Sequence, residues 1–223
     1  MIDRKTYFIQ KVNDSATPEN VFSTYLCDAK PLVIDNYLWM ENDYKPRTEV
    51  RLLYSKEYLF TGFKVFEKEI TATYTEINSP VYKDSCVEAF LSLEPERNAN
   101  YFNFEINAIG TIYAAFGKKG KRKVLSVEEI SRIKIYSALS EPFTGQIENL
   151  FWEIKLAVPF KLLSKYFEIE NGKEMYANFY KCGDETKEKH YGVWSPVVSD
   201  KPDFHLPQYF GKLIFGKSGI INN

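Results

Sequence analysis

Hydrophobic and polar residues alternate along much of this chain with the two-residue period that is typical of β-strands. The clearest alternation lies in residues 101–108, where Asn103, Glu105 and Asn107 fall on the face opposite four apolar side chains, because successive side chains of a strand point to opposite faces. A partner strand is expected over residues 86–93, joined to it by the turn-forming residues 97–100. The pair predicts one core face and one polar row, which suits either a solvated surface or a platform for a polyhydroxylated ligand.

The same criteria predict further strands, separated by short turns. They cover residues 50–54, 59–66, 70–75, 133–139, 151–158, 175–181 and 213–215. One short helix is expected after Pro159, because proline is tolerated in the first turn of a helix, and residues 127–130 predict a weaker helical turn. Since strands do not alternate with helices, we expect one antiparallel β-sandwich of jelly-roll or immunoglobulin-like type over residues 1–223, with residues 1–38 as an irregular lead-in.

Composition narrows the choice of partner. The 223 residues carry 29 Lys and Arg against 30 Asp and Glu, a net charge of -1, so the overall charge favours neither nucleic acid nor an anionic membrane. The basic cluster from Lys118 to Lys123 is interpreted as the solvated tip of a hairpin, because no basic stripe with interleaved aromatic residues continues from it. A neutral partner is therefore expected.

Three cysteines, Cys27, Cys86 and Cys182, are odd in number and far apart, so their spacing predicts neither a disulfide framework nor a metal site. His190 and His205, separated by fifteen positions, match no zinc-ligand spacing either. The sequence shows no apolar signal-peptide core and no run of eighteen apolar residues. Free thiols then favour a cytoplasmic location for the chain as written, or an extracellular or periplasmic one if a leader segment has been removed.

Residues 190–210 are too long for a hairpin turn and contain Trp194, both histidines, three prolines and Gln208. Such a segment is typical of a binding loop. Ser195 and Pro196 follow Trp194 at once and would hold its indole in one orientation, which favours a ligand-stacking role. Trp152, by contrast, lies in an alternating strand and is expected in the core.

Several motifs in this order carry a resemblance to a known family. They are KDSCVEAFLSL, YFNFEINAIGTIY, FWEIKLAVPFKLL, WSPV and PDFHLPQYFG. Together they resemble the family 9-like carbohydrate-binding modules, and more widely the DOMON-like sandwich domains, over roughly residues 39–215. The resemblance implies noncovalent binding of a mono- or oligosaccharide in polysaccharide utilisation, beside a glycoside hydrolase and without catalysis. It also allows a structural Ca²⁺, although no dense Asp/Asn loop is visible.

In the family two aromatic side chains enclose a sugar while charged and amide groups bind its hydroxyls. Trp194 matches the second aromatic residue, and Tyr82 stands where the family usually has the first as tryptophan. The polar residues at or near the family's ligand positions are Lys83, Asp84, Asn103, Glu105 and Gln208. Glu88 is interpreted either as part of the site or as a buried sheet carboxylate.

Two other functions remain open at this point. Asp84, Glu88 and Glu105 could supply the acid and base of a glycosidase, which needs two carboxyl groups about 5 to 10 Å apart across a cleft. The aromatic surface could instead bind another protein. Nothing in the sequence indicates a paired acid and base, so we expect a binding module that performs no chemistry.

Overall fold

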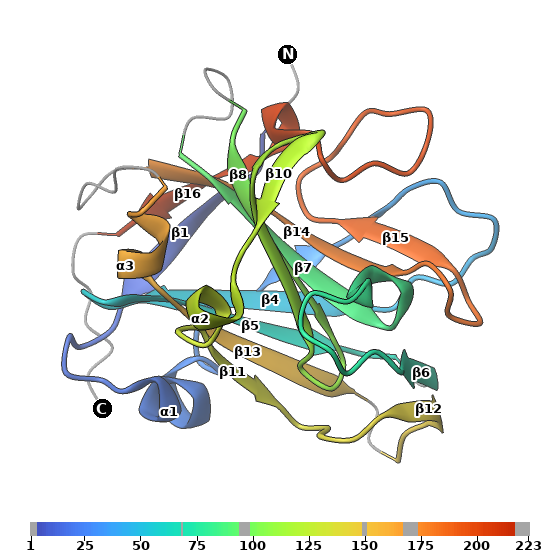
Figure 1. Ribbon diagram of the computed structural model, residues 1–223, viewed down its shortest axis with the longest axis horizontal. Helices are drawn as coiled ribbons and strands as arrows, with labels where there is room; N and C mark the ends of the chain where they lie inside the picture. Colours follow the sequence, from blue (N-terminus) through green and yellow to red (C-terminus); the bar gives the residue numbers. More distant parts are fainter. Residues whose placement is uncertain (1–3, 68, 94–98, 149–150, 167–173, 217–223) are drawn as a thin grey trace.

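Two β-sheets joined through one shared strand make up most of the computed structural model (Figure 1). The structure describes residues 4–67, 69–93, 99–148, 151–166 and 174–216. The first sheet has the order β10 (Lys121–Val124), β9 (Ile112–Lys118), β8 (Tyr101–Asn107), β7 (Cys86–Ser92), β14 (Glu174–Gly183), β16 (Gly211–Phe215) and β1 (Thr6–Lys11). β15 (His190–Val193) pairs with β14 and also with β3 (Asn36–Tyr37).

The second sheet continues from β1 through β4 (Thr48–Tyr54), β5 (Tyr58–Val65), β13 (Trp152–Pro159) and β11 (Lys134–Ser137), with β2 (Leu32–Ile34) beside β4. β6 (Glu69–Ala72) and β12 (Phe143–Gln146) form a separate two-stranded sheet. β1 joins the two large sheets because its first residues pair with β16 and its last two pair with β4. In Figure 1 the green strands β7 and β8 lie across the strands of the second sheet.

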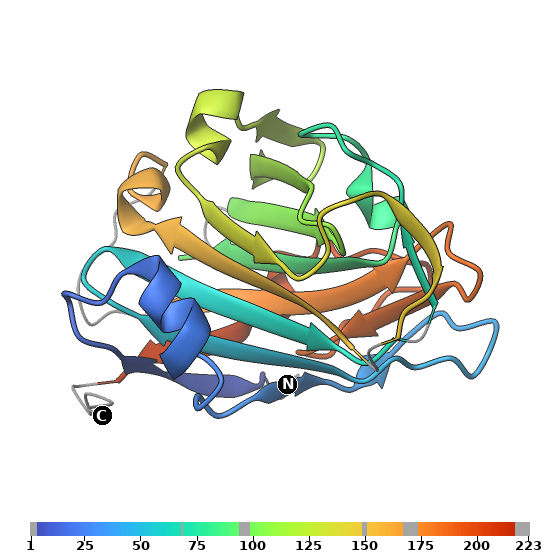
Figure 2. The ribbon, with the colours of Figure 1, turned by 90° about the horizontal axis from the view of Figure 1, so that it is seen from below.

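Helical segments are few and short. They are α1 (Pro18–Asn20), a π-turn (Val21–Tyr25), α2 (Val127–Ile130), α3 (Phe160–Leu163) and two 3₁₀ turns (Val81–Lys83 and Pro207–Tyr209). α2 begins with a capping box, in which Ser126 and Glu129 satisfy each other's backbone N–H groups. Figure 2 shows α1 beside the second sheet. No described helix is long and apolar enough to cross a membrane.

The main core lies between the inner faces of the two sheets. Phe102 and Phe104 of β8 stack there at 5.5 Å, and Phe63 of β5 meets Phe179 of β14. Trp152 is buried in the same core, as its alternating strand predicts, and its indole N–H donates to Glu67 at 3.0 Å. A smaller apolar cluster lies beside α1 and the π-turn.

A second apolar cluster covers the outer face of the first sheet. It combines side chains from β7, β8 and β14 with Val197, Phe204 and Phe210 from the segment that precedes β16. This cover buries the polar row of β8, so that Asn103 and Asn107 have no exposed surface. The solvated surface considered for that row is therefore excluded.

The predicted β-sandwich is confirmed, with three corrections. β1 pairs parallel with both of its neighbours, so the sandwich is mixed rather than purely antiparallel. Residues 1–38 are not an irregular lead-in where they are described, because β1, α1, β2 and β3 all begin there. Among the described residues, α3 follows Pro159 and α2 covers the helical turn expected over residues 127–130, while α1 is an additional short helix with its own Thr17 cap.

Candidate functional site

A cavity of about 390 Å³ opens on the outer face of the first sheet. Its floor is formed by outward-facing side chains of β7, β8, β9 and β14, and one wall is formed by the segment before β16. The lining residues are Asn78, Pro80, Tyr82, Glu88, Glu105, Tyr113, Arg122, Cys182, Asp184, Tyr191, Pro202, Asp203, Phe204 and His205. Aromatic rings, carboxyl groups and one guanidinium thus meet in a single concave site.

Strand register places two carboxyl groups side by side on the floor. Glu88 of β7 lies directly opposite Glu105 of β8, and Glu105 in turn lies opposite Tyr113 of β9. On the other side, Tyr180 of β14 lies opposite Glu88. Residues paired in this way point to the same face of a sheet. The two carboxyl groups on the floor therefore lie between Tyr113, which lines the cavity, and Tyr180, which is buried beside it.

Burial makes these carboxyl groups unusually weak acids. It raises the pKa of Glu105 to about 7, against the opposing effects of a hydrogen bond from Asn103 at 2.7 Å and the charge of Arg122. The pKa of Glu88 is raised well above its usual value, first by burial and then by Cys182 and Glu105. Burial also raises the pKa of Asp184 to about 6. Such groups both donate and accept hydrogen bonds near neutral pH, as paired hydroxyls of a ligand require.

Arg122 of β10 lies against His205 in the wall that the segment before β16 forms. Arg122 Nη1 lies 3.0 Å from His205 Nδ1, and the Tyr101 hydroxyl lies 2.9 Å from the same nitrogen. Arg122 Nη1 also lies 3.2 Å from His205 Nε2, so the guanidinium is close to both ring nitrogens and can donate only to the one that carries no proton. Burial, followed by the charge of Arg122, lowers the pKa of His205 to about 4, so the ring is uncharged at neutral pH. Phe90 stacks on it at 5.2 Å and holds its orientation.

Three of the sequence-predicted site residues come together at this cavity. Tyr82 and Glu105 line it, and Tyr82 is 37% exposed, so a ligand can reach its side chain. Asn103 lies buried below the floor and positions Glu105 through its amide. Glu88 combines both interpretations left open by the sequence, since it is buried in the sheet and also lines the cavity.

Three other predicted residues lie away from the lining. Asp84 is buried and accepts hydrogen bonds from the backbone N–H groups of Thr73 and Tyr74, which fixes the turn before β7 rather than a ligand. Lys83 pairs with Glu185 at the surface, at 2.7 Å. Gln208 is exposed in the 3₁₀ turn before β16.

Trp194 does not line the cavity, because its side chain points into the main core. It is 3% exposed and contacts Phe179 at a ring-centroid distance of 5.7 Å. Its backbone N–H donates to the Phe179 carbonyl at 2.9 Å, which continues the pairing of β15 with β14 by one residue. Tyr191 and Val193 of β15 face the outer cluster, so strand alternation turns Trp194 inward.

Most residues in the wall of the cavity were not predicted from the sequence. Phe204 and His205 lie in the segment recognised as a binding loop, but nothing in its composition distinguishes them from Trp194. Arg122 lies in the basic cluster of the β9–β10 hairpin, and its neighbours in sequence are lysines that give no sign of a site. The hairpin itself is confirmed. Tyr113 could have been found from register, because it pairs with Glu105.

A second hollow, of about 630 Å³, lies beside β11 and the β8–β9 turn. Isoleucines dominate its lining, and Glu19 is its one carboxylate among the described residues. An isoleucine-rich groove offers few partners for hydroxyl groups. The 390 Å³ cavity is therefore the better candidate for a polar ligand.

Comparison with known proteins decides the family. The model of carbohydrate-binding family 9 matches residues 26–215. The chain belongs to this family. Its function is accordingly carbohydrate binding, as its motifs imply, and the glycosidase alternative is not favoured.

The chain is also similar to individual proteins and solved structures. A candidate carbohydrate-binding protein from Bacteroides uniformis has 29% sequence identity and a TM-score of 0.85, covering 96% of this chain and 100% of that one. A family 9 module from Caldicellulosiruptor kristjanssonii, in complex with cellotriose, shares the fold at 12% identity and a TM-score of 0.61, covering 96% of both chains. An extracellular protein of Arthroderma benhamiae is 22% identical over 76% of this chain and 79% of its own length.

Proposed function

We propose that the family 9 module described here binds the sugar in the 390 Å³ cavity and leaves it chemically unchanged. The observation that carries this proposal is the convergence of an open tyrosine face, weakly acidic carboxyl groups and a guanidinium in one concave site. A pyranose ring has an apolar face that stacks on aromatic rings and hydroxyl groups that bind such polar groups.

The individual roles follow from exposure and charge. Tyr82 offers its ring face to the sugar, since it is the most exposed aromatic residue of the lining. Glu105 and Asp184 exchange hydrogen bonds with hydroxyl groups, and Arg122 donates to hydroxyl or ring oxygens. Asn103 holds Glu105 in place through the 2.7 Å hydrogen bond. These roles replace those expected for Trp194 and Gln208.

The geometry supports binding without hydrolysis. Glycosidases place two carboxyl groups on opposite sides of the scissile bond. Glu88 and Glu105 instead lie next to each other on the floor of the cavity, on adjacent strands, and Asp84 is occupied by hydrogen bonds to backbone amides. We therefore expect no turnover of chromogenic glycosides or polysaccharides above buffer. Turnover that Glu105→Gln abolishes would contradict a purely binding role.

A binding module of this kind serves polysaccharide utilisation beside a glycoside hydrolase. By binding the polysaccharide, the module brings the hydrolase to its substrate. The complexes of the Caldicellulosiruptor kristjanssonii modules with cellotriose and with glucose make these two sugars the first to test. A glycan array then extends the search to other sugars. Hits only on proteins, with none on glycans, would instead favour the protein-interaction alternative.

The decisive experiment places the sugar in one of the two hollows. Titration calorimetry with the best sugar compares Tyr82→Ala with the matched control Tyr136→Ala, since Tyr136 is also exposed but lines the isoleucine-rich hollow. Truncating a central aromatic anchor costs about 2 kcal/mol, so Tyr82→Ala should weaken affinity roughly thirtyfold. Tyr136→Ala should leave it unchanged. The reverse pattern would move the site to the other hollow.

A further inference from the structure

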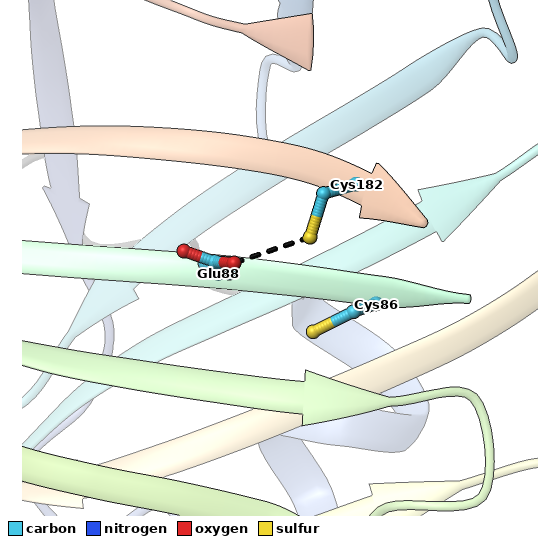
Figure 3. Close-up of side chains that lie close together, drawn as sticks. All are labelled: Cys86, Glu88 and Cys182. Atoms are coloured by element: carbon cyan, nitrogen blue, oxygen red, sulfur yellow. Dashed lines mark hydrogen bonds between the residues drawn. The ribbon is translucent and has the colours of Figure 1, made fainter. Parts of the chain in front are cut away.

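Two cysteines that are far apart in the sequence meet at the floor of the cavity, where Cys182 lines it and Cys86 lies buried beside Cys182. Cys86 of β7 lies directly opposite Cys182 of β14 in the antiparallel register. Glu88 follows Cys86 by two positions, so strand alternation brings its carboxyl group to the same face. Figure 3 shows the three side chains close together on β7 and β14, with the Cys182 thiol directed towards Glu88. Their potential ligand atoms all lie within 4.8 Å of one another.

We propose that Cys86, Glu88 and Cys182 form a binding site for a thiophilic divalent cation of the zinc class. Two sulfur ligands and one carboxylate are a donor set that zinc accepts, whereas calcium and magnesium prefer oxygen alone. This site goes beyond sugar binding and does not depend on it.

The geometry needs little adjustment. Zinc holds sulfur at about 2.3 Å and oxygen at about 2.0 Å, so two sulfur ligands and one oxygen ligand in a tetrahedral site lie roughly 3.5 to 3.8 Å apart. Cys182 Sγ already lies 3.1 Å from Glu88 Oε1, and the wider spacings reach at most 4.8 Å. Small rotations of the side chains would therefore bring all three ligands to a common ion.

A metal ion could reach this site through the cavity and would keep one open coordination position. All three residues are buried, yet Glu88 and Cys182 line the cavity, so an ion can enter through it. A tetrahedral ion with three protein ligands keeps one open position. Here that position would face the cavity, where water or a ligand oxygen can occupy it.

The charges of the site favour a cation. Among the described residues, the cavity lining holds four carboxyl groups, one of which pairs with Lys119, against the single guanidinium of Arg122. Zinc binds thiolate sulfur and ionised carboxylate, so coordination by Cys86, Cys182 and Glu88 displaces to solvent any protons that these groups carry and leaves a complex of net charge minus one.

The third cysteine provides a matched control, because Cys27 is exposed and remote in sequence from the cluster. Chelator-treated, reduced protein is titrated with Zn²⁺ by calorimetry. We expect one ion per chain, with affinity at least about 100-fold weaker in Cys182→Ser and in Glu88→Gln, and unchanged in Cys27→Ser. Failure to bind Zn²⁺, or binding that only Cys27→Ser abolishes, would overturn the proposal.

Cobalt substitution of the wild-type protein gives a readout that needs no variant. Co²⁺ bound by two thiolates produces an intense sulfur-to-metal charge-transfer absorption, which is absent when only carboxylates bind. Its appearance at one equivalent supports the site, and a spectrum with weak oxygen-ligand bands alone contradicts it. Mass spectrometry of the intact protein without reductant gives a further check. A mass lower by two hydrogen atoms, together with linked Cys86 and Cys182 peptides in a digest, would show that the pair forms a disulfide and would contradict the proposal.

Discussion

Trp194→Ala tests most directly where the sequence-based site and the structural site differ. The indole is 3% exposed, packs against Phe179 and fills the space above Gly211, where an added Cβ would come within 2.5 Å of Trp194 Cζ3. Truncating a tryptophan in such a core costs about 3 to 5 kcal/mol. For a chain of this size each kcal/mol lowers the melting temperature by about 2 to 4 °C, so the expected fall is roughly 6 to 20 °C.

Sugar affinity should not follow this loss of stability, because Trp194 does not line the cavity. Denaturant unfolding gives the change in midpoint, and calorimetry on the same sample gives the affinity at a temperature where the variant is still folded. Tyr82→Ala provides the opposite control, since Tyr82 is half-exposed at the cavity and should lose affinity with little change in midpoint.

The opposite result for Trp194→Ala would refute this reasoning. A thirtyfold loss of affinity at an unchanged midpoint would mean that the indole stacks on the sugar, as the WSPV motif led us to expect. Gly211→Ala checks the packing independently, because its new methyl group would clash both with the Trp194 ring and with the Lys5 carbonyl oxygen, 2.7 Å away. We expect it to cost about 1 to 3 kcal/mol.

Two further predictions concern pH and calcium. Burial lowers the pKa of His205 to about 4, whereas in the unfolded chain this imidazole titrates near pH 6.5. The neutral His205 therefore contributes to the free energy of unfolding in full above pH 6.5. This contribution is lost as the pH falls towards 4, because the unfolded chain then binds a proton that the native chain does not. The charged groups that act on this ring are Arg122, Lys119 and Asp203. Because His205→Gln removes the titrating imidazole, its urea midpoint should fall less between pH 7.5 and 5 than that of the wild type. An equal fall in both proteins would contradict the lowered pKa of His205. Among the described residues, the one group of three candidate metal ligands contains two thiols, whereas calcium prefers oxygen ligands. Millimolar Ca²⁺ should therefore leave the melting curve of chelator-treated protein unchanged. A raised melting temperature would show that a structural calcium site exists.

Much of the fold could be predicted because strand alternation is a local property. The polar row of β8 and the core position of Trp152 both follow from counting residues along one strand. What covers the outer face is not local, since Phe204 and Phe210 arrive from a segment far along the chain. The inward turn of Trp194 likewise depends on the pairing of β15 with β14, which no pattern within residues 190–210 reveals.

The candidate site depends on the same long-range pairings. Glu88 meets Glu105 through a hairpin neighbour, but it meets Tyr180 and Cys182 only because β7 also pairs with β14, a strand that begins at Glu174. A shift of that register by one residue would turn Val87 outward and Glu88 into the core between the sheets, at the cost of burying a carboxyl group there. The core residues of β7 thus fix the register, and the register in turn holds the carboxyl and thiol groups at the cavity floor. The packing of one face therefore determines the chemistry of the other.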